Sequence, residues 1–60
     1  MTQGEKNICN AVYEKGNLVG KKEFVSDGIA VESFVVEYLG ETYHMTKHDG
    51  EWVYFFHCIK

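Results

Sequence analysis

The sequence predicts a small all-β domain, a five-stranded antiparallel meander that could curl into a half-open barrel. Turn signals rich in glycine separate apolar runs, as at Asp27-Gly28, Gly40-Glu41 and Asp49-Gly50. The chain contains no proline that would interrupt a strand. Hairpin rules applied to the last two turns also place the aromatic residues of three segments on one face. Turns and hydrophobic pattern therefore agree on a sheet with one apolar side.

The elements follow in order along one domain. Residues 1–6 are polar and read as a flexible tail, and residues 7–60 form a single small β domain. Sixty residues support one small core, so stability is expected to be marginal. The predicted strands cover 8–13, 18–25, 29–39, 42–47 and 52–59.

The two carboxy-terminal hairpins set the predicted register. A type II′ loop at Gly40-Glu41 places Val36 opposite Met45, and a type I′ loop at Asp49-Gly50 places Met45 opposite Tyr54. Side chains alternate across a strand, so one face should carry the core. The predicted core face consists of Phe34, Val36, Tyr38, Tyr43, Met45, Trp52, Tyr54 and Phe56.

The turn around Asp27-Gly28 is predicted to be longer. A two-residue loop would place Glu23 directly opposite Glu32, which is repulsive. A three-residue loop of Ser26, Asp27 and Gly28 avoids that pair.

An alternative α+β fold, hairpin–helix–hairpin, has a helix at about 28–39. Val31, Phe34, Val35, Tyr38 and Leu39 have the spacing of an amphipathic helix. The valines and aromatic residues of this segment favour a strand instead.

Charge and composition bear on the partners. The net charge is −3, and all six basic residues are lysines. Arginine is the usual reader of phosphates and guanine edges, so its absence argues against specific nucleic-acid binding. The amino terminus lacks the apolar core of a secretory signal, and no stretch is suited to span a membrane. We expect a cytoplasmic protein in which Cys9 and Cys58 stay reduced.

The sequence contains little that indicates a catalytic or metal site. We expect that the protein is not an enzyme and that it binds no cofactor and no metal. No nucleophile elbow or phosphate-binding glycine loop occurs. Among Cys9, His44, His48, His57 and Cys58, the register brings together only His44 and His57, short of the four ligands of a structural zinc site. His44 is instead expected opposite Glu37.

The second sheet face is the candidate binding surface, with Phe55 near its centre and a polar surround. We expect a protein-interaction module of the inhibitor or adaptor type, acting by occupying a partner's surface; a homodimer contact is the other use of this patch. The alternatives are a small-barrel nucleic-acid-binding module, in which Lys21, Lys22 and Lys47 would line up near aromatics, and a metal-stabilised mini-domain. The predicted partner-binding residues are Val35, Glu37, Leu39, His44, Val53, Phe55 and His57.

Overall fold

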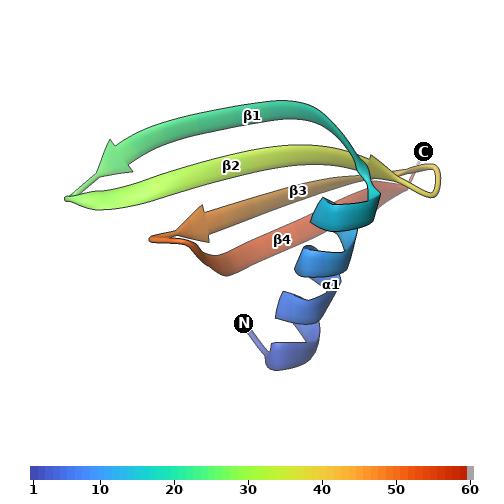
Figure 1. The fold of residues 1–60 in the computed structure, drawn as a ribbon, viewed down its shortest axis with the longest axis horizontal. Coiled ribbons are helices and arrows are strands. Elements are labelled where there is room, and N and C mark those ends of the chain that lie inside the picture. The colour runs from blue at the N-terminus through green and yellow to red at the C-terminus, as the bar shows by residue number, and fades with distance from the viewer. Residues whose placement is uncertain (60) are drawn as a thin grey trace.

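The protein is an α+β domain with one helix and one open four-stranded sheet. The computed structural model describes residues 1–59, and its elements are α1 (Gln3–Lys15), β1 (Asn17–Ser26), β2 (Ile29–Tyr38), β3 (Glu41–His48) and β4 (Glu51–Ile59). All neighbouring strands are antiparallel, in the order β1-β2-β3-β4 (Figure 1). The antiparallel meander is confirmed for four strands, and the helix predicted as an alternative at 28–39 is wrong, because that segment is β2.

The amino-terminal segment differs from the prediction made for it. A helix occupies Gln3–Lys15, where a tail at 1–6 and a strand at 8–13 were expected. Thr2 caps it, because its Oγ1 accepts a hydrogen bond from the Glu5 backbone N–H (3.2 Å) while Glu5 Oε1 accepts one from the Thr2 N–H (2.9 Å). This reciprocal capping box satisfies two backbone donors of the first turn. Cys9 and Val12, three positions apart, form the buried side of the helix.

Gly16 ends the helix at a close approach to β2. Its N–H donates to the Val12 carbonyl oxygen at 2.8 Å. A Cβ atom at this position would collide with Val36 Cγ1 and would lie 2.6 Å from the Val12 oxygen. Only glycine therefore allows this approach of the helix end to the sheet.

All three hairpins have two-residue loops, and each loop residue has a positive φ angle, as type I′ turns require. Between β2 and β3 the loop is Leu39-Gly40, with φ angles of 51° and 78°, rather than the predicted Gly40-Glu41. Val36 consequently lies opposite Tyr43, and Phe34 opposite Met45. This register differs from the prediction by two residues, so every side chain keeps its predicted face.

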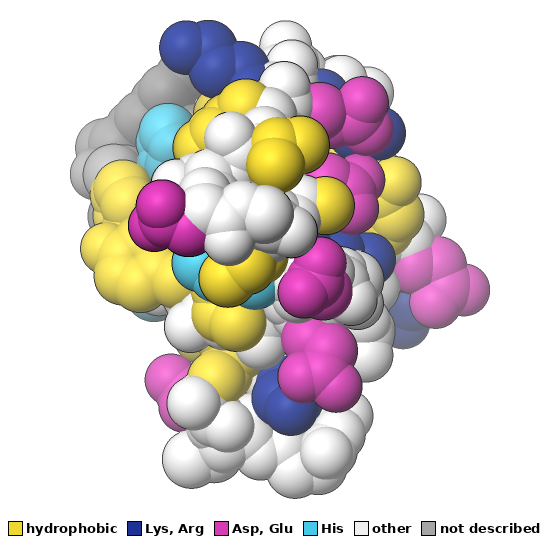
Figure 2. All heavy atoms as spheres, turned by 90° about the vertical axis from the view of Figure 1, so that its left-hand side faces the viewer, with side chains coloured by type: hydrophobic (Ala, Val, Ile, Leu, Met, Phe, Trp, Pro, Cys, Tyr) yellow, Lys and Arg dark blue, Asp and Glu magenta, His cyan; other side chains and the backbone are white. Residues whose placement is uncertain are grey.

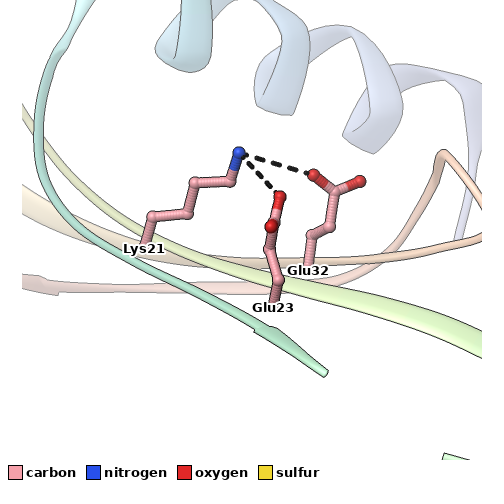
Figure 3. A network of polar contacts seen from close by, with 3 residues as sticks. All are labelled: Lys21, Glu23 and Glu32. Carbon is pink, nitrogen blue, oxygen red and sulfur yellow. Dashed lines mark ion pairs between the residues drawn. The ribbon is translucent and has the colours of Figure 1, made fainter. Parts of the chain in front are cut away.

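The β1–β2 loop is Asp27-Gly28 alone, which corrects the predicted three-residue loop. Glu23 does lie opposite Glu32, the arrangement that argued against this turn. Lys21 stands between them, with Nζ 3.0 Å from Glu23 Oε1 and 3.7 Å from Glu32 Oε2 (Figure 3). The shared lysine offsets the repulsion between the two carboxylates.

A β-bulge in β4 changes which residues face the helix. Lys47 pairs with Trp52, but Thr46 pairs with Tyr54, so Val53 is an extra residue in β4. Because one added residue reverses the alternation, the predicted faces are right for Trp52 and wrong beyond it. Tyr54 and Phe56 point away from the helix, and Phe55 lies opposite the buried Met45.

The core lies between the helix and one face of the sheet. Tyr13, Phe34 and Trp52 meet edge to face, with ring centroids 5.1 to 5.9 Å apart. Trp52 Nε1 also donates to Asn10 Oδ1 on the helix at 2.7 Å. The core cluster consists of Cys9, Val12, Phe34, Val36, Met45 and Trp52, with Tyr38, Tyr43 and Phe55 packed against it.

Candidate functional site

The sheet surface that faces away from α1, here called the open face, is the candidate site. Its members follow from the strand registers and from the alternation of side chains. The contacts of α1 with the sheet are made on the other face, through the core cluster. Within residues 1–59, no further helix or strand covers the open face. Its residues include Lys22, Phe24, Val31, Ser33, Val35, Glu37, Thr42, His44, Thr46, His48, Glu51, Tyr54 and Phe56.

Three aromatic rings form a continuous row on the open face. The rings of His44 and Phe56 stack in nearly parallel planes, with centroids 4.8 Å apart and 9° between the planes. Tyr54 meets Phe56 edge to face at 5.8 Å. Tyr54 and Phe56 remain 55% and 43% exposed. These rings are therefore fixed against one another while keeping much of their surface in water.

The end of the molecule at the β1–β2 and β3–β4 turns shows how charge and apolar surface separate. Figure 2 shows the largest group of hydrophobic side chains along one flank of this end, others across its middle, and most of the acidic side chains toward the opposite flank. At this end, the flank with the largest hydrophobic group therefore offers apolar contact with few carboxylates nearby.

Three of the predicted partner-binding residues lie on the open face. Val35 and His44 are direct cross-strand partners, and both are half-buried. Glu37 is on the same face but lies opposite Thr42. The predicted pairing of His44 with Glu37 is therefore wrong, and His44 instead packs on Phe56.

The other four predicted residues lie elsewhere. Leu39 is 82% exposed in the β2–β3 turn, and Val53 is the extra residue of the bulge. Phe55 packs against the core cluster. His57 lies opposite Tyr43, with its ring 5.3 Å from the tyrosine ring and Nε2 3.7 Å from Glu41 Oε1.

Sequence reasoning missed Tyr54 and Phe56 because it assigned both to the core. The segment from Trp52 to Phe56 is apolar at every position, so it has no polar–apolar alternation that would reveal an inserted residue. The turn alone fixes the register only as far as the bulge.

The lysines do not line up along the aromatic row. Lys47 lies on the helix side, with Nζ 4.5 Å from the Trp52 ring centroid and 5.5 Å from that of Tyr13. Lys21 lies on the same side, over Phe34 at 5.5 Å. These lysines extend over the core aromatics as cation–π partners. Lys22 alone of the three belongs to the open face.

The surroundings of Cys9 and Tyr43 raise the pKa of both side chains. Burial within the core, and then the charge of Glu5, raises the pKa of the Cys9 thiol. Desolvation raises the pKa of Tyr43, and its hydrogen bond to Glu41 Oε2 at 3.1 Å adds to the effect. A neutral thiol in the core is a poor nucleophile, so Cys9 serves packing.

The histidines and cysteines do not converge. His44 is on the open face and His57 on the helix side, so the predicted neighbourhood of these two residues is wrong. Among the described side chains, those of residues 1–57, no three His, Cys, Asp or Glu groups are arranged to hold a metal ion. The side chain of Cys58, considered both as a ligand and as a disulfide partner of Cys9, lies outside the described residues.

Comparison with protein-family models, with curated proteins and with solved structures gives no match to this chain. The single helix in the described residues is too short and too polar to cross a membrane.

Proposed function

We propose that this protein is a small cytosolic protein-interaction module that binds a partner through the open face, as an inhibitor or adaptor would. The observation that carries the proposal is the exposed row of His44, Phe56 and Tyr54 on a sheet face that the helix does not cover. The protein is proposed to act by covering a partner's surface, without catalysis.

The chemistry of the row fits a protein partner. Aromatic side chains dominate the binding energy of many interfaces, since they bury large areas at a small entropic cost. Stacking on His44 already restricts the Phe56 ring, which lowers the ordering cost of binding further. Thr42, Thr46 and Ser33 surround the row and can form the polar rim of an interface.

The proposal is tested by affinity capture with a matched pair of variants. Tyr54→Lys places a charge on the row, and Leu39→Lys places the same charge on a turn residue that is 82% exposed and distant in register from the row. Wild type and both variants are tagged, incubated with lysate of the source cell with and without nuclease, and compared by quantitative mass spectrometry.

We expect a stoichiometric protein that is retained by wild type and Leu39→Lys, survives nuclease, and is reduced about tenfold or more by Tyr54→Lys. Equal capture by wild type and Tyr54→Lys would refute the open face as the site. Capture that disappears with nuclease would assign the chain to nucleic-acid binding instead.

A further inference from the structure

The two edges of the sheet differ in how they are protected. Edge strand β1 carries Lys21, Lys22 and Glu23 in succession and a bulge between Leu18 and Gly20. Charged residues and bulges of this kind discourage pairing with another strand. Edge strand β4 has no Asp, Glu, Lys, Arg or Pro after Glu51, from Trp52 to His57.

The strand registers show which backbone groups of β4 point outward. Tyr38 and Glu41 flank a two-residue loop and form a hydrogen-bonded pair, so Tyr43 and Met45 also bond toward β2. His44, between them, bonds toward β4 and its partner Phe56. The N–H and C=O groups of Phe55 and His57 therefore point away from the sheet.

We propose that β4 pairs in antiparallel fashion with β4 of a second copy of this chain, around a two-fold axis at Phe56. The outward groups of Phe55 would then exchange hydrogen bonds with those of the partner subunit's His57, and the reverse. The result is a continuous eight-stranded sheet with both helices on one side. The hydrogen bonds of this dimer use backbone groups of the edge and not the open face, but Phe56 and the partner subunit's Phe56 would lie side by side on that face.

Three observations favour a second copy as the occupant. In a two-fold pairing each strand lies opposite its own copy, so a charged residue near the axis would face a like charge. The stretch Trp52–His57 contains no Asp, Glu, Lys or Arg, so no such repulsion arises there. The edge also carries exposed apolar side chains, with Val53, Tyr54 and Phe56 at 41%, 55% and 43%. The small core gives this chain more to gain from association than a larger domain would.

A backbone substitution tests the pairing directly. His57→Pro removes an N–H that the sheet does not use, which an edge strand tolerates. His57→Ala removes the same side chain and keeps the N–H. Val25→Pro is the control on the other edge, because Val25 adjoins the hydrogen-bonded Ser26–Ile29 pair, so its N–H also points outward, and it is 74% exposed.

Sedimentation equilibrium of the full chain across a dilution series gives the readout. We expect wild type, His57→Ala and Val25→Pro to approach twice the 6.9 kDa monomer mass, and His57→Pro to dissociate with a constant raised about tenfold or more. A wild type that stays monomeric, a His57→Pro variant that dimerises like wild type, or a dimer lost equally in Val25→Pro would each overturn the proposal.

A second measurement tests the β4–β4 pairing with the wild-type chain alone. It therefore still applies if circular dichroism shows that the His57→Pro variant is unfolded. Amide hydrogen exchange of wild type at low and high concentration should show slower exchange at Phe55 and His57 as the dimer forms. Unchanged exchange at these two amides would contradict the pairing, whatever the mass of the particle.

Discussion

At Gly16 the chain passes from helix to strand with no space for a side chain. The position has an ordinary negative φ of −81°, so the need for glycine comes from the contact with Val36 and the Val12 carbonyl and not from backbone strain. A single hydrogen atom in place of a methyl group thus sets how closely the helix approaches β2.

Replacing Gly16 should lower the free energy of unfolding far more than replacing Gly4, the glycine within the helix. Gly16→Ala forces the helix end away from β2, and we expect a loss of about 2 kcal/mol or more in the free energy of unfolding. Gly4→Ala meets only Thr2 Oγ1, at 3.9 Å, and should be neutral or stabilising by about 0.5 kcal/mol. Urea unfolding of both variants gives the comparison, and equal losses would contradict the close approach at Gly16.

The capping box makes part of the helix stability depend on pH. Hydrogen bonds from Thr2 lower the pKa of Glu5. A carboxyl group with a lowered folded pKa stabilises fully above its unfolded pKa, and its contribution is lost as the pH falls through the folded value. We therefore expect wild type to lose more melting temperature on acidification than Glu5→Gln does. Thermal unfolding from pH 7 down to pH 2 tests this, and parallel curves would contradict it.

At the scale of elements, the β1–β2 hairpin depends on one lysine. Lys21 contacts both Glu23 and Glu32, and hydrogen bonding and charge from Glu23 raise the pKa of Lys21. Lys21→Gln should destabilise the hairpin, because it leaves two facing carboxylates, and adding Glu23→Gln should restore the loss. Melting temperatures at low and high salt measure both effects. A double variant no more stable than Lys21→Gln would refute the bridging role.

The bulge in β4 makes adjacent phenylalanines unequal. Phe55 packs on the core cluster, whereas Phe56 is 43% exposed on the open face. We expect Phe55→Ala to lower the free energy of unfolding by about 2 kcal/mol and Phe56→Ala by less than about 1 kcal/mol. Chemical denaturation of the two variants gives both values, and the reverse order would contradict the bulge. This ordering replaces the sequence-based assignment of Phe55 to the binding surface.

Local patterns predicted the sheet well and its irregularities poorly. The turn at Asp49-Gly50 and the core positions Phe34, Val36 and Met45 followed from loop chemistry and alternation, since an error of two residues in register leaves the faces unchanged. The bulge at Val53 left no trace in a fully apolar run. The contacts of Lys21 with Glu23 and Glu32 could not be predicted before the register of β1 against β2 was known.

Unlike the bulge, the helix could have been predicted, because the sequence contains a pattern that indicates its start. Thr2 and Glu5 have the spacing of a capping box, and Cys9 and Val12 follow on one side. Isoleucine, valine and tyrosine in the same stretch favoured a strand, and tertiary packing of the helix against β2 and β4 outweighs that preference.

At the scale of the whole molecule, the helix of the described residues covers one face of the sheet and leaves the other face uncovered. The helix packs against one face through the core cluster, and Figure 1 shows it running across the strands at the end of the sheet where β1 begins. The other face carries the row of His44, Phe56 and Tyr54. The bulge decides which aromatics lie on each face. The proposed binding surface therefore depends on this one irregularity of β4.

The bulge is tested most directly by nuclear Overhauser contacts in solution, measured on a dilute sample so that contacts between chains do not interfere. The bulged register predicts contacts from the His44 ring to the Phe56 ring and from the Met45 methyl group to the Phe55 ring. A strand without the bulge would instead give contacts from Met45 to Tyr54 and from Tyr43 to Phe56. The first pattern would establish the aromatic row on the open face, and the second would return Tyr54 and Phe56 to the core and remove the proposed binding surface.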